Sequence, residues 1–84
     1  MDFPDSVVLQ VWNRAGGHCE CTRTTHGHLG RCNQSLVLSY RGREVTGGWE
    51  AHHIVSVEAG GKDVLSNCDI LCIQCHKLTR TYGR

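Results

Sequence analysis

The side chains most able to do chemistry in this sequence are its cysteines, of which there are six in 84 residues. Cys72 and Cys75 form a C-x-x-C pair, a spacing that presents two thiolates from one tight turn to a single metal ion. A tetrahedral site needs a second pair, and the upstream candidates are Cys19, Cys21 and Cys32. Because Cys19 and Cys21 are too close together for a regular knuckle, we expect one of them to join Cys32 across an expanded loop. We prefer Cys19, which follows an expected helix end, and keep Cys21 as a close alternative.

The remaining cysteine and two loop histidines are not expected to carry chemistry. Cys68 lies beside a strand pattern, which predicts a buried, small hydrophobic side chain at this position. His26 and His28 could bind a metal ion in principle, but solvated loop histidines are the interpretation that we favour.

A second group of candidate residues consists of His52, His53, Asn67 and His76. Neighbours in a regular strand point to opposite faces, so His52 and His53 can serve one site only if the strand ends or bends at that point. His76 directly follows Cys75, so a metal ion bound by the cysteines would fix its position.

The first element that could position these residues is a helix within residues 1–17, predicted by apolar residues at helical spacing. They are Val7, Val8, Val11, Trp12 and Ala15. Asp5 or Ser6 could cap its first turn. Gly16 and Gly17 should end the helix, because glycine readily adopts the left-handed conformation found at helix C-termini.

The rest of the chain predicts short strands and one further helix. Residues 18–34 are irregular and basic, and residues 36–38, 49–57 and 70–73 are strand candidates. From residue 73 onward the pattern begins a helix that later threonines and a glycine keep short. There is no internal repeat, and the length leaves room for one domain.

A chain of 84 residues buries too little apolar surface to be comfortably stable, so we expect disulfides, a metal ion or a partner to stabilise it. No signal-peptide pattern begins the sequence, and no apolar run approaches membrane-spanning length. These features favour the cytoplasm, a reducing compartment in which clustered cysteines hold zinc more often than disulfides.

The net charge is only +1, so no global electrostatic argument for nucleic acid is available, but the charges are unevenly distributed. Residues 21–43 carry four arginines and residues 71–84 carry three basic side chains, both without an acid. Residues 44–70 between them carry five acids. Basic segments that flank an acidic one suit a surface that contacts phosphates, although ordinary solvated charge explains the same pattern.

Three segments taken together resemble the HNH nuclease family. They are Trp49-Glu50-Ala51-His52-His53-Ile54, Leu65-Ser66-Asn67 and Leu71-Cys72-Ile73-Gln74-Cys75-His76-Lys77. The family pattern is an acidic residue or histidine beside a histidine, a central asparagine before a strand, and then C-x-x-C-H on a helix. The resemblance also reaches residues 14–19.

The resemblance implies a small α+β fold, a ββα-metal (HNH) finger with an N-terminal helix and a structural zinc site of four cysteines. The chain would form a single domain, with the N-terminal helix at residues 1–17, a basic zinc-loop region at 18–48 and the ββα-metal motif at 49–84. The sequence departs from the commonest family pattern at His52, where aspartate is more usual, and in the expanded upstream cysteine pair.

The resemblance also implies catalytic roles. His53 would be the general base, since imidazole titrates near neutral pH. His52 and His76 would hold a catalytic cation, which could be manganese, cobalt, nickel, magnesium or zinc. The Asn67 amide would bond backbone groups of the loop that bears His53. Candidates for contacts with DNA phosphates are Lys77, Arg80 and Arg31.

The expected function is therefore metal-dependent hydrolysis of DNA phosphodiester bonds, by nicking or by double-strand cleavage, in a bacterial or phage-infected cell. A dimer or a larger packaging, restriction or repair assembly stays open. The alternative is a zinc-ribbon module that binds nucleic acid without catalysis. That alternative accounts for the cysteines and arginines equally well, but it does not explain the positions of the three histidines.

Overall fold

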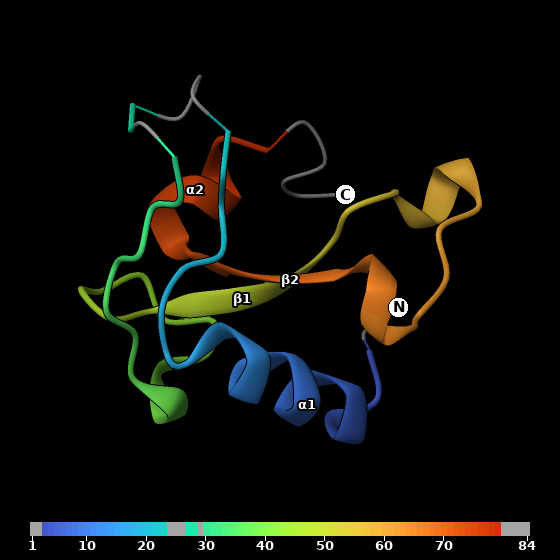
Figure 1. The fold of residues 1–84 in the computed structure, drawn as a ribbon, viewed down its shortest axis with the longest axis horizontal. Coiled ribbons are helices and arrows are strands. Elements are labelled where there is room, and N and C mark those ends of the chain that lie inside the picture. Colours follow the sequence, from blue (N-terminus) through green and yellow to red (C-terminus); the bar gives the residue numbers. More distant parts are fainter. Residues whose placement is uncertain (1–2, 24–26, 29, 80–84) are drawn as a thin grey trace.

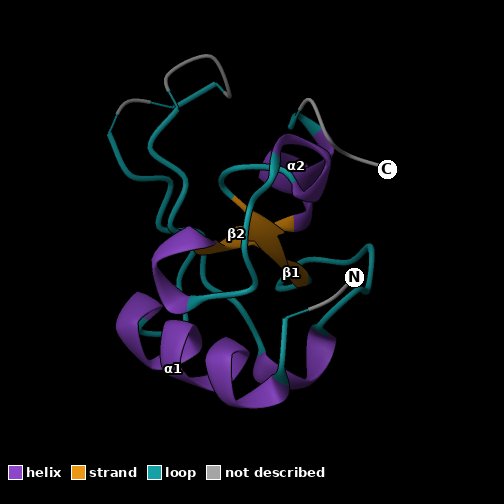
Figure 2. Ribbon diagram, turned by 90° about the vertical axis from the view of Figure 1, so that its right-hand side faces the viewer, coloured by secondary structure: helices purple, strands orange, loops and turns teal. Residues whose placement is uncertain are grey.

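The computed structural model describes residues 3–23, 27–28 and 30–79. In chain order the elements are α1 (Asp5–Ala15), η2 (Leu38–Tyr40), β1 (Trp49–His53), η3 (Val57–Ala59), η4 (Leu65–Asn67), β2 (Cys68–Cys72) and α2 (Ile73–Lys77). The two strands form one sheet that lies between α1 and α2 (Figure 1), and a view at right angles shows the same layers (Figure 2). The expected small α+β fold is confirmed, and β1, β2 and α2 have the arrangement of a ββα-metal finger. Across the described parts of the chain, no helix is both long enough and apolar enough to span a membrane.

Helix α1 begins and ends inside the predicted range of 1–17. It buries Val8, Val11 and Ala15, which recur on one face at helical spacing. Gly16 has a φ of 67° and lies in the left-handed region, so the predicted glycine cap is confirmed.

The prediction for the start of this helix was wrong. Neither Asp5 nor Ser6 caps it, because the cap position is Pro4 and no side chain caps the first turn. The Pro4 carbonyl instead accepts the amides of Val7 and Val8 at 3.0 and 3.1 Å, so backbone satisfies donors that a side chain would otherwise have to satisfy.

The two strands pair antiparallel, with His53 opposite Cys68 at one end. The strand predicted over residues 49–57 ends early at His53, because the backbone N–H of Val55 donates to a side-chain oxygen instead of to a strand. The strand predicted over 70–73 begins earlier, at Cys68, and gives way to α2 at residue 73.

The strand predicted at residues 36–38 was also wrong, because residues 36 and 37 are irregular and the short 3-10 helix η2 begins at Leu38. The carbonyl of Val37 accepts the amide of Tyr40 at 2.8 Å, which closes the turn. The same carbonyl accepts the indole N–H of Trp49 at 2.9 Å. A carbonyl held by a turn and by a side chain is no longer available for a strand ladder.

The core has two parts. The part against α1 is mainly apolar and consists of Phe3, Val8, Val11, Ala15, Trp49, Cys68 and Ile70. The part beside α2 is mainly cysteine and consists of Cys19, Cys21, Leu71, Cys72 and Cys75. Strand β2 serves both, since Ile70 and Leu71 point to opposite faces. Thiols bury little apolar surface, so the second part depends on what the sulfur atoms bind.

The segment that follows α1 runs past the sheet to the level of α2 and then returns (Figure 1). Its two arms pair through backbone, since the amide of Cys32 donates to the carbonyl of Cys21 at 2.8 Å and that of Asn33 to Cys19 at 3.1 Å. This pairing brings Cys19 and Cys32 side by side, although they are far apart in sequence.

Arg14 fixes the base of this segment to the sheet. Its guanidinium forms two hydrogen bonds to the Glu20 carboxylate, at 2.8 and 2.9 Å, and a third to the Cys68 carbonyl at 2.7 Å. Glu20 in turn accepts the backbone amide of Ile70 at 2.9 Å. A bidentate pair of arginine and carboxylate fixes the relative orientation of the two side chains as well as contributing binding energy. It therefore holds α1, the loop and β2 in fixed positions relative to one another.

Candidate metal centre and active site

Four thiols meet where the loop, β2 and α2 come together. The sulfur atoms of Cys19, Cys32, Cys72 and Cys75 all lie within 4.8 Å of one another. Cys19 and Cys32 come from the two arms of the loop, Cys72 ends β2 and Cys75 lies in α2. Four thiolates are the donor set of a closed tetrahedral zinc site, so this cluster could hold a metal ion such as zinc.

Hydrogen bonds to sulfur support this arrangement. The Cys72 amide donates to the sulfur of Cys19 at 3.2 Å, and the Cys75 amide donates to that of Cys72 at 3.5 Å. The contact with the Cys19 thiol lowers the pKa of Cys72, whereas the same contact, together with burial, raises the pKa of Cys19. Ionisation of the Cys72 thiol therefore makes ionisation of the Cys19 thiol less favourable. A divalent cation would allow both to ionise.

Cys68 is different from these four. It is fully buried in the apolar half of the core, as predicted. Burial raises the pKa of its thiol to about 11, so the thiol stays protonated at neutral pH. A neutral, buried thiol behaves as a small hydrophobic side chain.

The structure separates the two upstream alternatives. Cys19 lies in the four-thiol cluster, whereas Cys21 belongs to a second donor group with His28 and Cys75, whose donor atoms also lie within 4.8 Å of one another. His28 is half-buried, and its Nε2 lies 3.7 Å from the sulfur of Cys75, so the expectation of a solvated loop residue was wrong. His26 lies outside the described residues.

The second site is formed on the face of β1 that α2 covers. The rings of His52 and His76 lie edge to face, with centroids 5.7 Å apart and an interplanar angle of 71°. His52 is only 6% exposed. Glu50, two positions before His52, shares its face of the strand. Glu50 and His76 line a cavity of about 260 Å³. Two imidazoles and a carboxylate are thus gathered from one strand and one helix.

The electrostatics of this site favour a neutral imidazole at His76. Burial lowers the pKa of His76, and the negative charge of Glu50 opposes this shift without cancelling it. Only an unprotonated imidazole can bind a metal ion. The Glu50 carboxylate is itself held by Arg41, whose Nε donates at 2.7 Å, and by the Ala51 amide at 2.9 Å.

His53 occupies the opposite face of β1. Its ring stacks on Phe3, with centroids 3.9 Å apart and an interplanar angle of 18°. Its Nε2 lies 2.7 Å from Oδ1 of Asp63. A carboxylate only accepts, so Nε2 carries the proton in this hydrogen bond. When the ring is neutral, Nδ1 is then the nitrogen with a free lone pair.

Asn67 ties together the loop between β1 and β2. Its Oδ1 accepts the amide of Val55 at 2.7 Å, and its Nδ2 donates to the carbonyls of Val55 and Lys62, both at 3.0 Å. The side chain is nearly buried, at 9% exposed. The side-chain amide of Asn67 therefore fixes the loop that follows His53.

We expect Asn67→Ala to lower the free energy of unfolding by roughly 1–3 kcal/mol, because it removes three partly buried hydrogen bonds to the loop backbone. Urea unfolding at a fixed zinc concentration measures this loss. Asn13→Ala is the matched control, since Asn13 is exposed on α1 and alanine favours helix. Equal stability of the two variants would contradict the role given to Asn67 in the loop.

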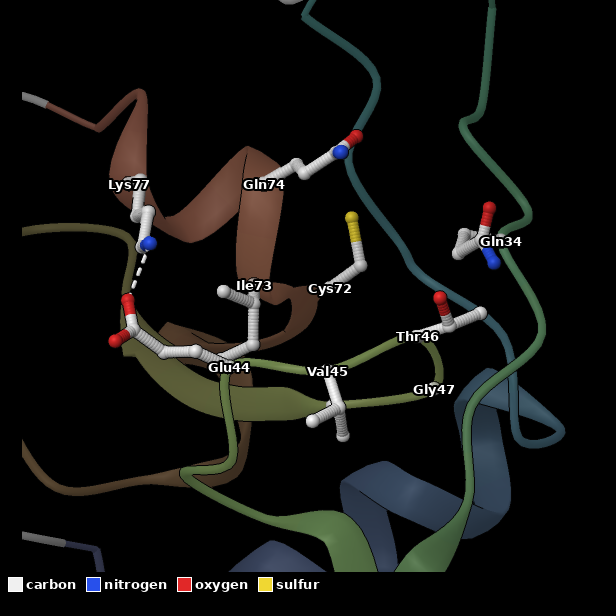
Figure 3. Close-up of a pocket in the computed structure, with 10 residues that line it drawn as sticks. Gln34, Glu44, Val45, Thr46, Gly47, Cys72, Ile73, Gln74 and Lys77 are labelled. Carbon is white, nitrogen blue, oxygen red and sulfur yellow. Dashed lines mark ion pairs between the residues drawn. The ribbon is translucent and has the colours of Figure 1, made fainter.

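Two of the candidates for phosphate contacts, Arg31 and Lys77, are engaged within the protein. Arg31 donates to the carbonyls of Ala15, Cys19 and His18, at distances between 2.6 and 3.1 Å. Lys77 pairs with Glu44 at the edge of a cavity of about 570 Å³ between residues 44–48 and the start of α2 (Figure 3). Arg80 lies outside the described residues.

Comparison with known families decides how this geometry is interpreted. The profile described as HNH endonuclease matches residues 30–80, which is more than half of the chain. The chain belongs to the HNH endonuclease family. Nuclease activity is the activity of that family, and its members act on DNA with divalent metal ions. Among curated proteins, no sequence matches this HNH chain at a significant level.

In this HNH chain the structure adds residues that sequence reasoning missed. Asp63, the partner of His53, sits in a loop and has no spacing that marks it. Glu50 was not among the candidate site residues, yet period-2 alternation from His52 places it on the same strand face. Arg41 could not be paired with it from sequence, because the contact depends on the turn between them.

Proposed function

We propose that this HNH protein is a metal-dependent endonuclease that hydrolyses phosphodiester bonds in DNA. In this proposal residues 1–84 form one domain, with zinc on Cys19, Cys32, Cys72 and Cys75 as its structural ion. A second divalent cation, on His52 and His76, is the catalytic ion.

The observation that carries the proposal is the meeting of His52 and His76. They come from different elements of the ββα unit, and their ring centroids lie 5.7 Å apart. Two protein ligands leave coordination positions open for phosphate oxygens and water. A cation bound there would stabilise charge on the scissile phosphate and on the departing 3′ oxygen. Glu50 adds negative charge beside the same cation.

Because β1 ends at His53, the alternation of faces need not hold beyond this residue, and we assign it the role of general base at the same phosphate. Asp63 holds its Nε2–H, so Nδ1 is left to accept the proton of the attacking water. A carboxylate in this position also stabilises the imidazolium that forms. Asn67 anchors the loop that leaves His53 and so acts as a positioning residue.

Cleavage of supercoiled plasmid by the pure protein tests the proposal directly. We expect nicked or linear product with a divalent metal ion and none with a chelator. A variant that lacks both imidazoles, His52→Ala with His76→Ala, is the control for a contaminating nuclease. If the wild type cleaves with no divalent metal ion tried, yet binds DNA, the non-catalytic zinc-ribbon alternative replaces this proposal.

The identity of the two imidazole ligands predicts a metal preference. Imidazole suits borderline ions, whereas magnesium prefers hard oxygen ligands, so cleavage should be faster with manganese, cobalt or nickel than with magnesium at equal concentration. His52→Asp should shift the preference toward magnesium. The rate measured with each ion for both proteins checks this expectation.

If magnesium already works best in the wild type, the carboxylate of Glu50 is a ligand and the two-histidine site is incomplete. Glu50→Gln decides this point, because it removes the charged oxygen and keeps the shape. A loss of magnesium activity that manganese restores would assign Glu50 to the cation.

His76→Ala distinguishes the role of a metal ligand, proposed for His76, from the role of general base, proposed for His53. Loss of one imidazole weakens cation binding, so we expect activity to fall and then to recover in part as the metal concentration rises. The measurement is the cleavage rate as a function of metal concentration. A loss that no concentration relieves would mean that His76 does not act through the cation.

A further inference from the structure

A second group of metal-binding side chains adjoins the four-thiol cluster, and the proposed function makes no use of it. It consists of Cys21, His28 and Cys75, whose donor atoms lie within 4.8 Å of one another. Cys75 belongs to both groups. Cys21 and Cys75 are buried and His28 is half-buried, so these donors face the protein interior rather than bulk water.

The geometry at His28 is that of a ligand. Its Nδ1 lies 2.9 Å from the carbonyl of Gly30. A carbonyl cannot donate, so Nδ1 carries the proton and the lone pair of a neutral ring is on Nε2. Metal-binding histidines are usually fixed in this way by a hydrogen bond from the other nitrogen. The hydrogen bond to the Gly30 carbonyl thus stabilises the tautomer of His28 in which Nε2 can bind a metal ion.

The Nε2 atom of His28 lies close to the shared sulfur. Its nitrogen lies 3.7 Å from the Cys75 sulfur. Zinc bond lengths and a tetrahedral angle place a nitrogen and a sulfur ligand of one ion about 3.6 Å apart. The separation therefore has the value expected of two ligands on one ion.

Charge gives an independent reason for a second ion. Four thiolates carry twice the charge of one divalent cation, and three of the four cysteines in that cluster are buried. Uncompensated charge is costly in a buried position. A second cation that shares a thiolate with the first offsets part of the excess.

From these observations we infer that the protein binds two metal ions in a cluster bridged by the Cys75 sulfur. The first ion is held by Cys19, Cys32, Cys72 and Cys75. The second is held by Cys21, His28 and Cys75, with its fourth position left to solvent or another donor. Because it has fewer protein ligands, the second ion is the more weakly bound and exchanges first. A thiophilic borderline ion such as zinc or cobalt suits this donor set.

The test is metal stoichiometry on a full-chain parent that carries His52→Ala and His76→Ala, which remove the proposed catalytic cation, measured after loading with excess zinc and removal of unbound ion. This parent should hold two zinc ions per chain, and a mild chelator should remove one while the fold persists by circular dichroism. Cys21→Ser and His28→Ala, added to this parent, should each hold one and stay folded. His18→Ala is the matched control, since His18 bonds a carbonyl through Nδ1 at 2.8 Å but belongs to neither donor group. It should hold two.

Cadmium substitution tests the bridge itself. Two cadmium resonances coupled to each other through the shared sulfur are expected in this parent, and one is expected when His28→Ala is added. Saturation of the parent at one ion, or two ions in all variants, would overturn the inference. Unfolding of both Cys21→Ser and His28→Ala with loss of all zinc would also overturn it, because these residues would then belong to the structural site. None of these measurements depends on cleavage, so the nuclease proposal stands or falls separately.

Discussion

Cys72→Ser is expected to leave the protein mostly unfolded and without tightly held zinc. Structural zinc contributes roughly 10–16 kcal/mol of apparent binding free energy. That is as large as the total stability of a typical domain, roughly 5–15 kcal/mol. Four of the five buried residues in the part of the core beside α2 are cysteines, so little apolar burial remains there to replace the lost ligand. Far-UV circular dichroism and elemental analysis of the purified variant measure both losses.

Cys68→Ala is the matched control for this experiment. Cys68 is equally buried but lies in the apolar half of the core, against α1. We expect the control to keep its zinc and its fold, with a loss of stability of about 1 kcal/mol from the small void. Wild-type protein that contains no zinc, with all its cysteines in disulfides by mass, would overturn the zinc assignment and the expectation of a reducing compartment.

His53→Ala is expected to reduce the rate of DNA cleavage by about 10²–10⁴-fold, the usual contribution of a general base. Zinc content should not change, because the four-thiol cluster does not include His53. DNA affinity and its salt dependence should also be retained, since they depend on contacts between basic side chains and phosphates. Single-turnover cleavage and a binding titration at several salt concentrations separate these quantities.

The stacking of His53 on Phe3 requires a control for stability. Loss of an aromatic pair costs about 0.5–1.5 kcal/mol, so His53→Ala should unfold at a somewhat lower temperature. Phe3→Leu removes the same stacking contact and keeps the imidazole, so it should cleave at close to the wild-type rate. Asp63→Asn should reduce the rate without removing the base. If His53→Ala cleaves as fast as the wild type, the base assignment is wrong and His52 becomes the candidate.

The sequence by itself determined what depends on neighbours along the chain. The spacing of Val8, Val11 and Ala15 is sufficient to define α1, and Gly16 is sufficient to end it. Likewise, the C-x-x-C spacing at Cys72 and Cys75 brings two sulfurs together through one turn, whatever the rest of the fold does. The family pattern gave the order of strands and helix in the ββα unit, because it records those local spacings. These features could be predicted because their geometry is set within a few residues.

Tertiary structure decided which upstream cysteine joins the four-thiol cluster. The sequence favoured Cys19 because it follows the helix end, but it left Cys21 as a close alternative. The choice follows from the pairing of the loop arms and from the Arg14–Glu20 contact that fixes the loop to β2. Tertiary structure also places Nε2 of His28 at 3.7 Å from the Cys75 sulfur, a contact that no spacing in the sequence predicts.

Tertiary structure also decided where the histidines of β1 lie. Strand alternation alone predicts that His52 and His53 diverge, but not which of them faces α2. That choice depends on burial of Trp49 against α1, which fixes the face of the whole strand and so turns His52 toward His76. Asp63 reaches His53 only because Asn67 anchors the loop between the strands. Such contacts join residues that are distant in sequence, and their geometry exists only once the sheet and its loops have packed.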